Sequence, residues 1–184
     1  MTNKQIKFIS VIVLQVAIIF AIIIFKLSIL TGGTEILLKI QPLDPRDLLR
    51  GDYATFQYEI SNLDSYYAQG QPIKNGDTVY VTLKQAGKNW AVKNIKTSKP
   101  AGGELFIAGK VESGGFENQA DQLALQQLNN SRFHIIYGIE QYFIPEGEGR
   151  NFSFSNKEAV AQVAIDDNGS AVIKRIYVDG QPWP

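Results

Sequence analysis

The N-terminal region is dominated by one uninterrupted apolar run. Residues 8–25 contain no charged side chain, and their only polar side chains are Ser10 and Gln15. An α-helix rises ~1.5 Å per residue, so this run forms about 27 Å of helix, close to the ~30 Å hydrocarbon thickness of a bilayer. Residues 27–30 extend the run, and the Lys26 side chain can reach the far interface. The pattern predicts a single N-terminal transmembrane helix.

Two other interpretations of this run are a cleaved signal peptide and a buried core helix. A signal peptide has a shorter apolar region of ~7–15 residues that ends at a small-x-small cleavage site. Residues 27–33 offer no clear site of that kind. A domain of this size has no need of a terminal helix that is apolar all round. An uncleaved anchor is therefore favoured over both.

The charges beside the run predict its orientation. Lys4 and Lys7 precede the span, and the positive-inside rule places such residues in the cytoplasm. The protein is then a single-pass protein of the cytoplasmic (inner) membrane, with its C-terminal domain outside. Only residues 31–34 separate the span from that domain. The predicted division is a cytoplasmic stub and transmembrane helix over residues 1–30, and an extracytoplasmic domain over residues 31–184.

After the span, apolar and polar residues alternate over many short segments. Alternation with a period of two is typical of half-buried strands. Strands are predicted over residues 34–41, 53–60, 78–85, 90–95, 104–112, 131–145, 160–165 and 171–178. The side chains expected to face the core include Ile36, Leu38, Ile40, Ala54, Phe56, Tyr58, Ile60, Val79, Val81, Leu83, Leu105, Ile107 and Val111. Residues 166–170 contain Asn-Gly, which predicts a hairpin between the last two strands.

The segments between the strands are predicted to be turns and loops. Asp44 and Pro45 can begin one helical turn over residues 46–49. Residues 61–77 are predicted to form a polar loop, and the end of the chain a loose tail. Short helices fit residues 122–128 and 146–158. The expected fold is mainly β, an antiparallel sheet, sandwich or partly open barrel with room for one or two short helices.

Composition narrows the possible partners. The chain has 18 basic and 18 acidic residues. Lys4, Lys7 and Lys26 belong to the apolar segment, so the domain has 15 basic residues against all 18 acidic ones. Nucleic-acid binding needs a basic face, so no nucleic-acid partner is expected. The absence of cysteine excludes disulfides, thiol catalysis and cysteine–zinc sites, and it fits either redox compartment.

Two groups of charged residues are candidates for chemistry. Arg46, Asp47, Arg50 and Asp52 crowd one turn, where they could bind a partner's charges or a polar ligand. The favoured interpretation is structural, because acidic residues in turns commonly cap backbone N–H groups; the two roles can coexist. Gly51 is expected to take a positive φ in this turn.

Glu140, Glu146 and Glu148 form the second group, near Tyr137 and Tyr142. Paired carboxylates can act as general acid and base in glycoside hydrolysis. Solvated strand and loop acids are the favoured interpretation, because carboxylates are rarely buried without a partner.

Other chemistry receives little support. His134 is the only histidine, so we interpret it as packed or exposed at a rim. Residues 166–168 lack the EF-hand spacing. The chain contains no P-loop, no dinucleotide glycine fingerprint and no nucleophile elbow. We therefore predict no cofactor, no metal and no catalytic residue.

Two blocks of sequence resemble a known family. Residues 51–58, GDYATFQY, resemble the motif of the bacterial GDYXXLXY family, with Phe56 where the family has leucine. Residues 44–50 resemble its lead-in, and residues 137–149, YGIEQYFIPEGEG, resemble its second recognisable segment. The resemblance extends over essentially the whole chain. It implies a membrane-anchored domain without an established activity, often encoded beside multi-pass membrane proteins, and hence a membrane partner.

Two functions remain open at this point. The first is a membrane-anchored binding or assembly module that works with an integral membrane partner. The second is an envelope hydrolase or carbohydrate-binding enzyme that uses Asp52 or Glu140. The residues with a predicted binding role are Arg46, Asp47, Arg50, Gly51, Asp52, Tyr53, Tyr58, Tyr137, Glu140, Tyr142, Phe143 and Glu146. Any such role depends on the two blocks meeting in space.

Overall fold

A computed structural model describes residues 2–41, 53–115, 132–143 and 157–183. It contains one long helix, twelve strands and one 3₁₀ helix in that part of the chain. They are α1 (Asn3–Gly32), β1 (Thr34–Gln41), β2 (Tyr53–Thr55), β3 (Gln57–Tyr58), β4 (Asn62–Asp64), η1 (Ser65–Ala68), β5 (Thr78–Ala86), β6 (Asn89–Lys96), β7 (Phe106–Ser113), β8 (Arg132–Ile136), β9 (Gln141–Phe143), β10 (Ala159–Ile165), β11 (Ala171–Val178) and β12 (Gln181–Trp183). The short helices predicted at 46–49, 122–128 and 146–158 fall mainly or wholly outside the described residues.

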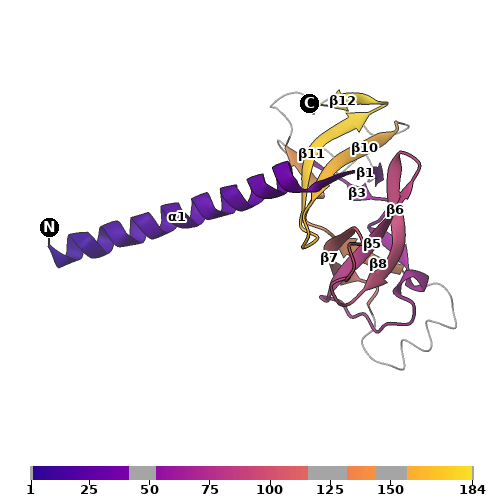
Figure 1. Cartoon of the computed structure of the whole chain (residues 1–184), viewed down its shortest axis with the longest axis horizontal. Coiled ribbons are helices and arrows are strands. Elements are labelled where there is room, and N and C mark those ends of the chain that lie inside the picture. Colours follow the sequence, from indigo (N-terminus) through magenta and orange to yellow (C-terminus); the bar gives the residue numbers. More distant parts are fainter. Residues whose placement is uncertain (1, 42–52, 116–131, 144–156, 184) are drawn as a thin grey trace.

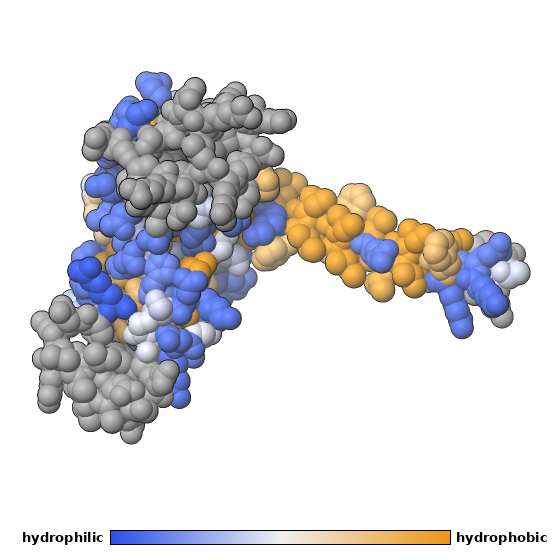
Figure 2. Space-filling view, turned by 180° about the vertical axis from the view of Figure 1, so that it is seen from behind, coloured by the Kyte–Doolittle hydropathy of each residue, from blue (hydrophilic) through white to orange (hydrophobic). Residues whose placement is uncertain are grey.

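Helix α1 projects from the β domain as a single rod (Figure 1). It is long enough and apolar enough to cross a membrane. Its large apolar side chains from Ile6 to Leu27 are exposed, and Figure 2 shows hydrophilic residues at its N-terminal tip. A helix that is apolar all round suits a lipid environment, because lipid removes the cost of exposing apolar surface to water.

The helix passes into β1 almost without a linker. Gly33 is the one residue between them, and its backbone N–H donates to the Ile29 carbonyl at 2.9 Å. A side chain at Gly33 would lie 2.6 Å from that carbonyl oxygen and 2.9 Å from the carbonyl oxygen of Ile165. Ile29 is only 1% exposed, because this end of α1 contacts β10 and β11. The domain is therefore packed directly against the last turns of the helix.

The first sheet has the strand order β12-β11-β10-β1-β3, and its described pairs are antiparallel. Strand β1 buries Ile36, Leu38 and Ile40, as the alternation predicts. The hairpin predicted between the last two long strands is confirmed. Its Asp166 carboxylate accepts hydrogen bonds from the backbone N–H groups of Asn168 (2.9 Å) and Ser170 (2.7 Å).

The second five-stranded sheet has the order β4-β8-β7-β5-β6. Val79, Val81 and Leu83 of β5 are buried, as expected. β5 and β6 form a long hairpin that turns at Gly87, whose φ of +67° suits glycine. Buried side chains of both sheets form one hydrophobic cluster. The prediction of a mainly antiparallel β domain behind one apolar helix is confirmed.

Three sequence-based expectations are wrong in detail. Residues 61–77 are not simply a loop, because they contain β4 and η1. The end of the chain is not loose: β12 pairs with β11 and buries the Trp183 side chain. The run 131–145 is not one strand, because Gly138 has a φ of +77° and separates β8 from β9, which belong to different sheets.

The strand predicted over residues 53–60 is also divided. Strand β2 pairs with β9 in a two-stranded sheet, whereas β3 pairs with β1 in the first sheet. Phe56, Tyr58 and Ile60 are nevertheless buried on one side, as predicted. The structure gives no description of the Ala54 side chain.

The two large sheets touch where the β10–β11 turn meets β7. The backbone N–H of Ala108 donates to the Gly169 carbonyl at 2.9 Å. Gly169 has a φ of +81°, and a Cβ at this position would lie 2.8 Å from the Ala108 nitrogen and 2.8 Å from the Phe106 ring. The turn therefore needs glycine for two reasons, its backbone conformation and its close approach to β7.

We expect Gly169→Ala to lower the free energy of unfolding by more than Gly87→Ala does. Both residues have positive φ, which costs a non-glycine residue about 1–2 kcal/mol, but a Cβ at Gly87 meets nothing within 4 Å. Chemical denaturation of the detergent-solubilised full chain measures the difference. Equal losses in the two variants would contradict the close approach.

Candidate functional site

The two family-like blocks lie side by side. Strand β2 pairs with β9 in antiparallel register, with Tyr53 opposite Phe143 and Thr55 opposite Gln141. The backbone N–H of Phe56 continues the contact by donating to the Glu140 carbonyl at 3.0 Å. The structure thus brings together segments that are more than 80 residues apart in the sequence.

Two buried tyrosines join these blocks in a reciprocal way. The Tyr58 hydroxyl donates to the Ile139 carbonyl at 2.6 Å, and the Tyr137 hydroxyl donates to the Ile60 carbonyl at 2.6 Å. Tyr58 of the first block bonds to the backbone within the second block, and Tyr137 of the second block bonds to the backbone just after the first. We call these two bonds the tyrosine clamp. A buried hydroxyl without an acceptor is costly, so each clamp bond fixes the position of both segments.

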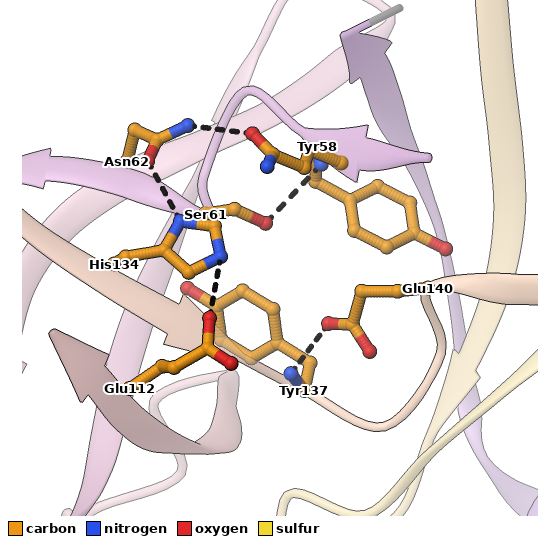
Figure 3. Close-up of polar contacts among 8 residues, drawn as sticks. Tyr58, Ser61, Asn62, Glu112, His134, Tyr137 and Glu140 are labelled. Carbon is orange, nitrogen blue, oxygen red and sulfur yellow. Dashed lines mark hydrogen bonds and ion pairs between the residues drawn. The ribbon is translucent and has the colours of Figure 1, made fainter. Parts of the chain in front are cut away.

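A tight turn places Tyr137 for this contact. The Glu140 carboxylate accepts a hydrogen bond from the Tyr137 backbone N–H at 2.6 Å, as the close-up shows (Figure 3). Gly138 inside the turn has a positive φ that other residues rarely adopt. The carboxylate predicted as a possible catalytic acid therefore has a structural partner, in the manner of acidic residues that cap turns.

The burial of the two clamp tyrosines changes the pKa values of their hydroxyls. It raises the pKa of both the Tyr58 and the Tyr137 hydroxyl well above the ordinary value, and the nearby negative charge of Glu140 raises each pKa further. Both effects disfavour the phenolate. The two hydroxyls therefore keep their protons at neutral pH and remain available as donors.

A chain of polar side chains runs along one edge of the site. Asn62 donates from its amide nitrogen to Gln57 at 2.9 Å, and its amide oxygen lies 2.8 Å from His134 Nδ1. His134 Nε2 lies 3.4 Å from a carboxylate oxygen of Glu112. Figure 3 shows the imidazole held between these two neighbours. The ring is partly buried, in keeping with a packed or rim position.

This row of hydrogen-bonded side chains offers no nucleophile for His134 to activate. Ser61 is the nearby hydroxyl, but it is fully buried and accepts a hydrogen bond from the Tyr58 backbone N–H at 3.2 Å. Among the described residues, no group of three or more His, Cys, Asp or Glu side chains could hold a metal ion. Within this part of the chain the arrangement acts as a structural network.

A shallow hollow of about 420 Å³ lies beside the clamp. It is lined by Thr55, Phe56, Gln57, His134, Ile136, Gly138, Glu140 and Gln141. A larger hollow, of about 610 Å³, lies against the first sheet and includes Glu35, Trp90 and Tyr177. Among the described residues, none with a predicted binding role lines that larger hollow, whereas Glu140 lines the smaller one.

The remaining predicted site residues are only partly described. Tyr142 packs near Trp183, with ring centroids 6.1 Å apart, whereas Phe143 is 80% exposed. The residues Arg46, Asp47, Arg50, Gly51, Asp52 and Glu146 lie outside the described part of the chain, and the structure describes only the backbone of Tyr53. The spacing of Asp52 from Glu140 stays a prediction.

Sequence reasoning missed several residues of this site. Ser61 and Asn62 lie in the segment predicted to be a polar loop, and Glu112 lies at the end of a predicted strand. Trp183 was placed in a loose tail. No local pattern identifies these residues, because their partners come from distant segments. Trp183 itself was a signal, since tryptophan is highly buried on average.

Comparison with known proteins identifies the family. The family model described as "GDYXXLXY protein" matches residues 15–176, which is most of the chain. The chain belongs to the GDYXXLXY family. No curated protein and no solved structure matches it.

The family motif has a clear structural role in this chain. Phe56 stands at the leucine position of the motif, and Tyr58 at its last tyrosine; both are fully buried. Their rings meet edge to face, with centroids 5.6 Å apart. This half of the GDYXXLXY motif therefore builds the core and the tyrosine clamp.

We expect Tyr58→Phe and Tyr137→Phe each to lower the free energy of unfolding by about 1–3 kcal/mol, because each leaves a buried carbonyl without its donor. Chemical denaturation of the full chain in detergent measures the loss. Tyr66→Phe is the matched control, because Tyr66 is 81% exposed. A loss in the clamp variants no larger than in Tyr66→Phe would show that the clamp contributes nothing.

The raised tyrosine pKa values also predict sensitivity to alkali. The unfolded chain releases its tyrosine protons near pH ~10, whereas the folded clamp retains them to higher pH. The clamp's contribution to stability is therefore complete below about pH 10 and falls as the pH rises towards the folded pKa. Thermal unfolding from about pH 8 to about pH 11 should show a steeper loss of Tm in the wild type than in the Tyr58→Phe/Tyr137→Phe variant. Parallel losses would contradict this.

Proposed function

We propose that this protein is a membrane-anchored extracytoplasmic domain that binds or assembles with an integral membrane protein. The observation that carries the proposal is the junction of α1 with the domain. An exposed apolar helix long enough to span a bilayer passes into β1 through the single residue Gly33. Such a connection holds the domain at the membrane surface in a fixed orientation.

A fixed orientation favours binding within the membrane plane. A substrate-binding enzyme that samples the surrounding space gains from a flexible tether, whereas an assembly subunit gains from pre-organisation, which lowers the entropy lost on binding. The packing of Ile29 against the domain supports the second case. The hydrolase alternative gains no support from Glu140, which is engaged in the turn at Tyr137.

The charges near the helix support the proposed topology. Lys4 and Lys7 lie at the N-terminal end of α1, and the first acidic residue, Glu35, follows its C-terminal end. The positive-inside rule then orients the N-terminus towards the cytoplasm and the β domain outside the inner membrane.

Co-purification tests the proposal. We expect the tagged full chain, extracted from its native membrane in mild detergent, to carry an integral membrane protein in a constant ratio. Recovery of the chain alone would contradict the proposal. A chain in which Gly-Ser residues are inserted after Gly33 serves as a comparison, because it keeps α1 and the domain but loosens their connection; we expect it to retain less partner.

Cysteine labelling provides the control for topology. The chain contains no cysteine, so Lys88→Cys in the β5–β6 turn and Thr2→Cys before α1 each introduce a single thiol. A membrane-impermeant maleimide applied to spheroplasts should label the first variant, and should label the second only after the membrane is opened. The reverse pattern would contradict the proposed orientation.

A further inference from the structure

Between residues 8 and 29, one face of α1 carries two polar side chains that have no partner in the described structure. Residues on an α-helix are ~100° apart, so positions 8, 11, 19, 22, 26 and 29 lie within about 40° of Gln15. We call this set of residues, with Gln15 itself, the Gln15 face. No hydrogen bond or ion pair joins the side chain of Gln15 or Lys26 to another described residue. Phe8, Val11, Ile19 and Ile22 complete its exposed part.

The hydroxyl side chains of the helix differ from Gln15 in this respect. The Ser10 hydroxyl donates to the Ile6 carbonyl at 2.9 Å, Ser28 donates to Phe25 at 2.8 Å, and Thr31 donates to Leu27 at 2.9 Å. These hydroxyls are satisfied by their own helix. The Gln15 carboxamide lies near the middle of the apolar run, where lipid offers neither donor nor acceptor. It therefore needs a partner from another helix.

The domain limits which helix can meet this face. Ile29 belongs to the Gln15 face and is buried against β10 and β11. The domain therefore extends over the same side of α1 on which Gln15 lies. A second copy packed in parallel through this face would place its own domain in the space that the first domain occupies. A membrane helix that ends beneath the domain meets no such obstacle.

We propose that the Gln15 face binds a transmembrane helix of another integral membrane protein, directly beneath the β domain. This inference rests on the proposed function and names the surface that performs it. The partner helix offers a hydrogen-bonding side chain at the depth of Gln15. It offers a carboxylate near the depth of Lys26, which lies about 17 Å further along the axis.

The opposite face of α1 provides an internal comparison. Ser10, Ala17, Ala21 and Ser28 lie about 120–160° away from Gln15. Small residues allow close approach of membrane helices, so this face is where a second copy of the chain would pack. The two faces can be distinguished by experiment because they predict different neighbours.

Site-specific photo-crosslinking in the native membrane tests the inference. A photoreactive amino acid replaces Ile22 on the Gln15 face or Ala21 on the opposite face of the full chain. We expect Ile22 to give an adduct with a different protein. The crosslinked peptide, identified by mass spectrometry, should be a transmembrane segment that carries a polar or acidic side chain. Gln15→Leu should reduce this adduct about three- to tenfold, in line with polar contacts between membrane helices.

Ser10→Ala is the matched control, because its hydroxyl is already bonded within the helix, and we expect the adduct to remain unchanged. Four results would each overturn the inference: an adduct between two copies of the chain at position 22, an adduct from position 21 only, no adduct at all, or an adduct that Gln15→Leu does not reduce.

Alkaline carbonate extraction distinguishes a failure of this inference from a failure of the proposed function. Release of the chain by carbonate overturns the proposed function as well, whereas a retained chain that co-purifies a membrane protein without an adduct at Ile22 overturns the inference alone.

Discussion

The tyrosine clamp is the interaction on which the domain's architecture depends. Tyr58 belongs to the first sheet through β3, and Tyr137 follows β8 of the second sheet. Their hydroxyls bond to carbonyls that lie 81 and 77 residues away in the sequence. Since both hydroxyls are buried, neither has water as an alternative acceptor. The clamp therefore holds the two sheets in one arrangement and sets the register of β2 with β9.

This arrangement changes the interpretation of the family motif. A cluster of charge and glycine before a strand resembles an active site, but the described half of the motif forms core and clamp. Glu140, the other candidate acid, fixes the turn that presents Tyr137. The features that support the proposed function lie instead in α1 and at its junction with the domain. Ile29 and Gly33 seat the domain on α1, and Gln15 leaves an unsatisfied carboxamide within the span. The motif thus holds the fold together, whereas the partner binding that we propose involves a different part of the chain.

Local patterns predicted most of the strands and little of the site. The alternation of Ile36, Leu38 and Ile40 identified the buried face of β1, because a strand exposes every second residue to the same side. The Asn-Gly turn identified the last hairpin. The alternation over residues 131–145 predicts one strand, and only the structure shows that Gly138 divides it into β8 and β9 of different sheets. The clamp and the contacts of His134 depend on long-range pairing, which alternation does not encode. The role that we propose for Gln15 also depends on the structure, because the burial of Ile29 shows which side of the helix the domain covers.

Native-state hydrogen exchange of the Phe56 amide tests the central claim most directly. This N–H donates to the Glu140 carbonyl and links the two motif blocks beside the clamp. If the clamp joins both sheets into one cooperative unit, the Phe56 amide exchanges only on global unfolding, with the same free energy as the core amides of β10. Exchange of Phe56 at a distinctly lower free energy, while β10 stays protected, would show that the blocks separate by local opening and would contradict the account.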